Sequence, residues 1–245
     1  MVGVGHGPTV ADEGTGVPGP PRTLGRVTRT SERPPPPPPA RLPDAAGVGR
    51  LLEDALRART PREITGPGRR AAVMLMLYDR GDQAHLLLTK RSEELPSHPG
   101  QISLPGGAID DADASARDAA LRETEEEVGV PRSALRVIGE LDDVGTMATG
   151  FIIRPFVAVV AGAMVAVPSD REVARVIDVP VIDLLLADVA LPPDPAPLAL
   201  RYPLAGEDVW GATARILRTF CRVARFALSP EGGPSADRDG GGPAR

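Results

Sequence analysis

Three glutamates, Glu123, Glu126 and Glu127, follow one another closely enough to share one turn of a helix. If residues 115–128 are helical, positions three and four apart are neighbours, so the three carboxylates project from one side. Like charges this close repel by a few tenths of a kcal/mol per pair on an exposed helix. Mg²⁺ takes oxygen ligands and keeps bound waters, so it would relieve that repulsion. The spacing indicates either a metal site or a solvated acidic helix.

The residues that flank these glutamates favour the metal site. Gly106 and Gly107 precede the expected helix, and glycine lets the backbone approach a ligand closely. Arg122 stands immediately before the first of the three glutamates, and Gly129 closes the helix after the last. Glu125 falls on another side of the helix, where we expect it to face solvent.

The elements that position this segment follow from hydrophobic periodicity. Apolar residues at helical spacing predict helices over 48–59, 115–128 and 209–227, with short helical turns near 181–186. Apolar runs of strand length predict strands over 71–78, 84–89, 101–104, 135–142, 151–160 and 173–176. The first two strands are joined by a polar turn and should form a hairpin. Strands with helices between and after them predict a mixed α/β (α+β) domain.

Both ends of the chain differ in composition from its middle. Residues 1–43 contain 11 Pro and 7 Gly and no aromatic side chain, so they bury too little surface to offset the entropy of ordering. Residues 229–245 are similarly rich in Gly and Pro. We therefore expect a disordered leader over 1–43, one folded domain over 44–228 and a disordered tail over 229–245.

The overall charge and the apolar content exclude several classes of protein. The chain has 28 basic and 33 acidic side chains, and this acidic balance argues against sequence-independent binding of nucleic acid. No apolar run approaches the roughly 18–20 residues of a membrane span, and no secretory signal is recognisable at the start. The single Cys221 cannot form an internal disulfide. We expect a cytoplasmic protein that binds a small molecule, and a homodimer remains open.

One nine-residue stretch resembles a known family. Residues 122–130, Arg-Glu-Thr-Glu-Glu-Glu-Val-Gly-Val, are similar to the second half of the Nudix box, R-E-U-x-E-E-x-G-U, with Thr124 where an aliphatic residue is usual. The first half of the box, G-x5-E-x7, fits less closely. Asp113 stands where that pattern has glutamate after Gly107, and one additional residue separates it from Arg122.

Two further stretches resemble the coenzyme A pyrophosphatase branch of this family, in which one extra loop residue is expected. Residues 87–107 are similar to L-L-T-x-R-S-x-x-L-x-x-H-x-G-Q-x-x-F-P-G-G, with Pro96 where Arg is common and Leu104 where Phe is common. Residues 209–217 are similar to the W-G-A-T-A-R-I-L helix near the end of such proteins. Three motifs in the same order are much more specific than one glutamate box.

The resemblance implies a Nudix fold, in which a mixed β-sheet is sandwiched between α-helices, and a requirement for Mg²⁺ or Mn²⁺. It implies that Glu123, Glu126 and Glu127 bind the metal and that Arg122 orients a carboxylate of the box. Either Glu126 or Glu127 would act as general base. Asp113 is expected to hold the loop rather than replace the missing glutamate.

The substrate would be bound by residues upstream of the box. Lys90 and Arg91 are candidates to hold phosphates, although a solvated strand end is an equal alternative for both. Gly106 and Gly107 would let phosphate oxygens approach the metal. We expect His98 to brace its loop by hydrogen bonding rather than to act in catalysis.

The function that the resemblance implies is hydrolysis of coenzyme A, or of its acyl or dephospho forms, at the pyrophosphate bond. A divalent ion would position the attacking water and lower its pKa, and a carboxylate would take the proton. Two alternatives stay open at this point. One is a pyrophosphatase for another nucleoside diphosphate derivative such as ADP-ribose or NADH, and the other is a silent Nudix domain that senses a nucleotide.

Overall fold

The computed structural model describes residues 38–39, 41–146, 149–193, 195–196 and 199–229. Most of the expected leader and nearly all of the expected tail lie outside the described residues, so their disorder stays a prediction. None of the helices in the described part of the chain has the length and apolar character that a bilayer crossing needs.

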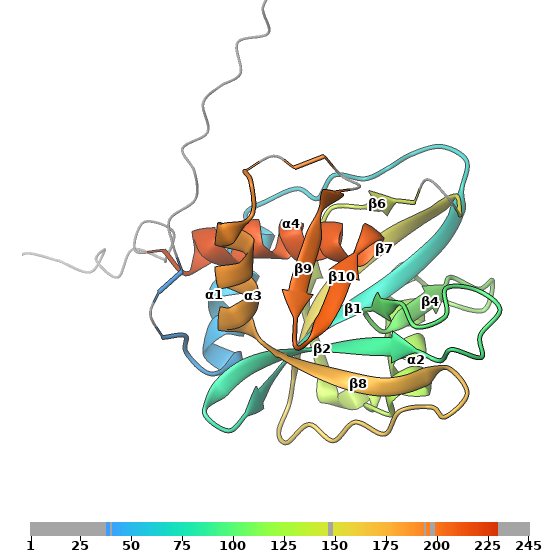
Figure 1. The fold of residues 1–245 in the computed structure, drawn as a ribbon, viewed down its shortest axis with the longest axis horizontal. Coiled ribbons are helices and arrows are strands. Elements are labelled where there is room, and N and C mark those ends of the chain that lie inside the picture. Colours follow the sequence, from blue (N-terminus) through green and yellow to red (C-terminus); the bar gives the residue numbers. More distant parts are fainter. Residues whose placement is uncertain (1–37, 40, 147–148, 194, 197–198, 230–245) are drawn as a thin grey trace, which may run out of the picture. The chain divides into compact units, whose positions relative to one another are not determined.

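The described residues form a mixed sheet of eight strands with β1 at its centre (Figure 1). Its strands are β1 Arg69–Arg80, β2 Gln83–Arg91, β3 Ile102–Ser103, β4 Gly106–Ala108, β5 Leu135–Glu140, β6 Val144–Gly145, β7 Phe151–Val160 and β8 Val173–Pro180. β1 runs parallel to β7 and antiparallel to β2 and β4. β7 also pairs with β5 and β6, and β2 pairs with β3 and β8. The expected hairpin of β1 and β2 is therefore present.

Helices cover both faces of this sheet. They are α1 Ala45–Arg57, α2 Ala116–Val128, α3 Val181–Ala190 and α4 Gly211–Ala227, and the turn Arg132–Ala134 is a 3₁₀ helix. Successive strand residues point to opposite faces. In β1, Leu75 and Leu77 accordingly pack with α1, α3 and α4, whereas Met74 and Met76 pack with α2. In Figure 1, α3 lies in front of the sheet and α2 behind it. The predicted sheet between helices is confirmed.

The region before the last helix differs from the prediction. A second hairpin, β9 Arg201–Leu204 and β10 Glu207–Trp210, occupies positions where the helix was expected to begin. Ala205 and Gly206 have positive φ angles of 50° and 78°, which close the tight turn between the two strands. Val209 is buried, so it matched the helical pattern while belonging to a strand. Trp210 is extended and caps α4 rather than opening it.

Two further elements are longer or more regular than expected. The region near 181–186 forms the ten-residue helix α3 instead of short turns. Residues 106–108 lie beyond the strand predicted over 101–104, yet they form β4 and pair with Ala71–Val73 of β1. Local composition predicted neither feature, because both depend on packing against distant parts of the sheet.

We expect a chain shortened to residues 44–228 to keep a cooperative thermal transition. Asp44 must be retained, since its carboxylate accepts a hydrogen bond from Gly47 N at 2.7 Å and caps α1. The shortening removes Leu42, which packs against the core, so Tm should fall by only a few degrees. A chain that begins at residue 59 is the control: it lacks α1 and should not fold. Loss of the transition in 44–228 would show that the boundary is wrong.

Candidate active site

The helix that carries the glutamates begins and ends where the sequence predicted. Asp118 N donates to the side chain of Ser115 at 3.2 Å, and Gly129 ends α2 in the left-handed conformation with φ of 68°. Thr124, which replaces the usual aliphatic residue, is fully buried, and its hydroxyl donates to Ala120 O at 2.6 Å. The substitution therefore leaves no unpaired polar group in the core.

The three glutamates have different surroundings. Glu127 is buried, Glu123 is half-buried and Glu126 is exposed. Burial raises the pKa of Glu127 to about 7, against the hydrogen bond that its Oε2 accepts from Gly106 N at 3.1 Å and the nearby charge of Arg91. Burial also raises the pKa of Glu123, the charge of Glu126 raises it further, and the charge of Glu123 raises the pKa of Glu127. A bound cation would favour the ionised form of both.

Arg122 connects the loop before α2 to the box. Its Nε and Nη2 atoms donate to the two Asp113 oxygens at 3.0 and 2.9 Å, a paired geometry that suits guanidinium and carboxylate. Its Nη1 atom donates to Glu123 at 2.6 Å and to Glu126 at 3.2 Å, and Nη2 also reaches Ala108 O at 3.3 Å. The bonds from Arg122 lower the pKa of Asp113 to about 2. Asp113 therefore holds the loop through Arg122.

The two glycines lie where side chains would not fit. A Cβ on Gly107 would lie 2.5 Å from the carboxyl carbon of Glu123, so this glycine is in direct contact with the box. Gly106 has φ of 146°, and a Cβ there would lie 2.3 Å from Ala72 O. The loop thus brings backbone against two of the three glutamates.

Gly106→Ala is expected to destabilise the fold and to reduce activity. Backbone strain alone should cost about 1–3 kcal/mol, and the clash adds to that cost. The cost arises because the backbone conformation is strained for alanine and the clash is with a backbone oxygen, which cannot turn away. Denaturant unfolding measures the change. Gly81→Ala is the matched control, since Gly81 has φ of 67° but nothing lies within 4 Å of an added Cβ; it should cost about 1 kcal/mol. Equal losses in the two variants would contradict this interpretation.

The two basic candidates at the end of β2 have different partners. Lys90 Nζ lies 3.4 Å from both carboxylate oxygens of Glu207, which belongs to the β9–β10 hairpin and also pairs with Arg175. Arg91 is close enough to Glu127 for its charge to lower the pKa of that carboxyl, and its Nε is buried without a hydrogen-bond partner among the described residues. The structure therefore brings Arg91, and not Lys90, next to the glutamates.

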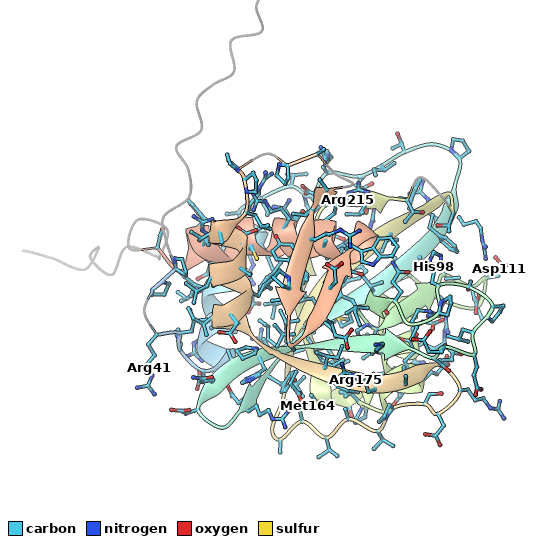
Figure 2. The ribbon with its side chains drawn as sticks, viewed as in Figure 1. Arg41, His98, Asp111, Met164, Arg175 and Arg215 are labelled. Carbon is cyan, nitrogen blue, oxygen red and sulfur yellow. The ribbon has the colours of Figure 1, made fainter. Side chains whose placement is uncertain are left out.

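His98 is exposed and has a positive φ of 56°. Its backbone oxygen accepts a hydrogen bond from Gln101 N at 3.3 Å, and no hydrogen bond of its ring occurs within the described residues. Figure 2 shows His98 on the same side of the view as Asp111, which lies in the loop before α2, while Arg41 is on the opposite side. The expected bracing role of the His98 ring stays a prediction.

Sequence reasoning missed Glu172, which immediately precedes β8. Its charge raises the pKa of both Glu123 and Glu127, so it lies close to both. The backbone fixes this segment, because Ser92 N donates to Glu172 O at 2.9 Å and Ser169 N donates to Glu127 O at 2.8 Å. No sequence pattern marks Glu172, since it meets the box only through the fold.

The chemistry of these side chains fits a divalent cation. Hard oxygen donors come from four carboxylates, those of Glu123, Glu126, Glu127 and Glu172. The close approach of these like charges is unfavourable without a cation. Across the described ranges, however, no three His, Cys, Asp or Glu side chains are already gathered as a metal-binding group. Arg122 holds two of the box glutamates, so a complete site requires these side chains to rearrange.

Comparison with known proteins identifies the family. The NUDIX domain model matches residues 68–198, which is more than half of the chain. This protein belongs to the Nudix hydrolase family. The Nudix hydrolase NudL of Enterobacter sp. (strain 638) is 36% identical over 179 residues, covering 66% of this chain and 86% of that protein. NudL of Escherichia coli (strain K12) is 45% identical over 130 residues, which cover 53% of this chain and 66% of that protein.

A solved structure is also similar to this Nudix hydrolase. The crystal structure of a NUDIX hydrolase from Alicyclobacillus acidocaldarius is 19% identical, covers 70% of this chain and 100% of that chain, and has a TM-score of 0.45. Nudix hydrolases act on pyrophosphate bonds of nucleoside diphosphate derivatives and generally use divalent ions such as Mg²⁺ or Mn²⁺. Because this chain belongs to the family, the expected enzyme class, a hydrolase that acts on pyrophosphate bonds, is confirmed.

Proposed function

We propose that this Nudix hydrolase cleaves the pyrophosphate bond of coenzyme A, and of its acyl or dephospho forms. Coenzyme A itself would give phosphopantetheine and adenosine bisphosphate. The supporting observation is that residues 87–107, which resemble the coenzyme A branch, end directly on the glutamate box. Gly106 N donates to Glu127, and Gly107 lies against Glu123. The two motifs therefore contribute to one site.

In this proposal Glu123, Glu126 and Glu127 hold the divalent ion, and Glu172 adds a fourth carboxylate nearby. The bound ion would neutralise phosphate oxygens and lower the pKa of the attacking water. Arg122 keeps Glu123 and Glu126 in place before the ion binds.

The attacking water must pass its proton to a carboxylate within hydrogen-bond reach. The two proposed candidates are Glu126, which is exposed and paired with Arg122, and Glu127, which is buried. Arg91 is proposed to bind a phosphate through guanidinium N–H groups, and the unpartnered Nε of that side chain supports this role. Lys90 would contribute charge at the edge of the site only if the substrate displaces its contact with Glu207.

The activity is expected to depend fully on a divalent cation. Treatment with a chelator should reduce coenzyme A turnover to background, because without a bound ion nothing neutralises the phosphate oxygens or activates the attacking water. Excess Mg²⁺ or Mn²⁺ should restore it, and circular dichroism before and after treatment should show that the fold persists. Undiminished turnover in the protein freed of metal would contradict the metal site. Metal-dependent hydrolysis of other pyrophosphates, with no hydrolysis of coenzyme A, would contradict only the proposed substrate.

A further inference from the structure

A cavity of about 290 Å³ lies beside the start of α2 and is separate from the contacts of the box. Ile109 and Ala116 line it and pack with the core cluster on the α2 face of the sheet. Ile64 and Ile152 complete an apolar wall. A cavity of this size and character suits part of a small organic ligand.

Two arginines at this cavity differ in their partners. Arg154 is neutralised, since it donates to both oxygens of Asp143 at 3.1 and 3.3 Å and lies 3.3 Å from a Glu63 oxygen. Arg70 is exposed and donates to backbone oxygens, those of Ile64 at 2.8 Å and Gly66 at 3.2 Å. Within the part of the chain that is described, no carboxylate forms an ion pair with Arg70.

Among the described residues Arg70 therefore has no carboxylate paired with it, whereas the other charged side chains that line the cavity, Glu63, Asp143 and Arg154, pair with one another. A guanidinium group has five N–H donors, and two are used by the backbone oxygens, so donors remain for a ligand. Planar paired donors of this kind match the geometry of phosphate oxygens. The cavity is thus suited to a phosphorylated group that also carries an apolar, flat part.

The register of the sheet relates Arg70 to the box. Ala72 pairs with Gly107, which lies against Glu123, and Arg70 is two residues earlier on the same face of β1. Ile109 N donates to Arg70 O at 3.0 Å, which continues the pairing. Two strand residues span about 7 Å, so the backbone of Arg70 lies about 7 Å along β1 from Ala72, the residue that pairs with Gly107 beside the box.

We propose that this cavity is a subsite for the 3′-phosphorylated adenosine end of the substrate, with Arg70 binding the 3′-phosphate. The inference rests on the proposed function, because in coenzyme A one ribose carries both the 3′-phosphate and the pyrophosphate. The isoleucine wall contacts the base. Arg70 is then a determinant of specificity, and the carboxylates of the box act on the neighbouring pyrophosphate.

The test is binding of adenosine 3′,5′-bisphosphate by isothermal titration calorimetry, with AMP as the ligand that lacks the 3′-phosphate. Arg70→Gln should weaken binding of the bisphosphate roughly 10- to 100-fold and bring its affinity close to that of AMP. Arg70→Lys keeps the charge but loses the paired donors, so it should recover part of the affinity for the bisphosphate, which separates a charge effect from loosening of residues 64–66. Ala116→Leu fills the cavity and should weaken both ligands. Thermal unfolding of each variant checks the fold.

Equal effects of Arg70→Gln on bisphosphate and AMP would overturn the subsite, as would unchanged binding of both ligands to Ala116→Leu. Wild-type protein that binds the two ligands equally would also overturn it. Binding of the bisphosphate that depends on Arg70, in a protein that does not hydrolyse coenzyme A, would support the subsite and reject the proposed function.

Discussion

Replacing Glu127 by glutamine is expected to lower kcat/KM by roughly 10²–10³-fold while the fold persists. Glutamine has the same shape, and its amide oxygen can still accept the hydrogen bond from Gly106 N, but it has no charge to hold a cation. Burial raises the pKa of Glu127 to about 7, above its value in the unfolded chain. As the pH rises above the pKa of the unfolded chain, ionisation of this carboxyl favours the unfolded state. The glutamine variant lacks that ionisation, so it should be at least as stable as wild type at pH 8.

The matched control is Glu125→Gln on the same helix. Glu125 is exposed, lies 3.0 Å from Arg132 and takes no part in the contacts of the box, so its turnover should stay within about twofold of wild type. Steady-state kinetics with metal in excess measures both variants. Unchanged turnover in Glu127→Gln would contradict the assignment of the metal site.

Coenzyme A is expected to be preferred over ADP-ribose by roughly 10- to 150-fold in kcat/KM. Coenzyme A carries a 3′-phosphate and a pantetheine arm that ADP-ribose lacks, and a charge-assisted contact with that phosphate contributes about 1.5–3 kcal/mol. Kinetics with coenzyme A, dephospho-coenzyme A and ADP-ribose at one metal concentration measures the preference. The dephospho form isolates the contribution of the 3′-phosphate.

Equal or better turnover of ADP-ribose would reject the coenzyme A branch. It would leave the membership of the Nudix hydrolase family intact, because that rests on the match over residues 68–198. A preference carried over undiminished to dephospho-coenzyme A would assign the selectivity to the pantetheine arm instead of the phosphate.

Features of the fold that depend on local sequence were predicted correctly. The closing Gly129 and the spacing of apolar residues placed α2 almost to the residue, and Ser115 caps it in the structure. The central strands β1 and β2 were found from apolar runs that are buried on both faces. In these cases the residues that specify the element are part of it.

Features that depend on contacts between distant segments were missed. The β9–β10 hairpin was hidden because Val209 is buried in a strand at a position that also fits a helix. Glu172 approaches the box only because β8 pairs with β2. Asp113 was expected to hold its loop, but its paired bonds to Arg122 could not be derived from spacing that departs from the family pattern.

Lys90 and Arg91 show a limit of reading adjacent residues as one site. Lys90 reaches Glu207 while Arg91 approaches Glu127. The strand predicted over 84–89 ended before both residues, and the pairing of β2 with β8 shifts its register between them, so strand alternation could not have been applied to the sequence. Their roles as phosphate ligands remain a proposal, better supported for Arg91.

The most direct test of the proposed function is the mass of the products that the purified protein forms from coenzyme A with Mg²⁺. Hydrolysis at the pyrophosphate predicts phosphopantetheine and adenosine 3′,5′-bisphosphate in equal amounts, with both formed roughly 10²–10³-fold more slowly by the Glu127→Gln variant. Intact coenzyme A after prolonged incubation, or cleavage at any other bond, would contradict the proposal.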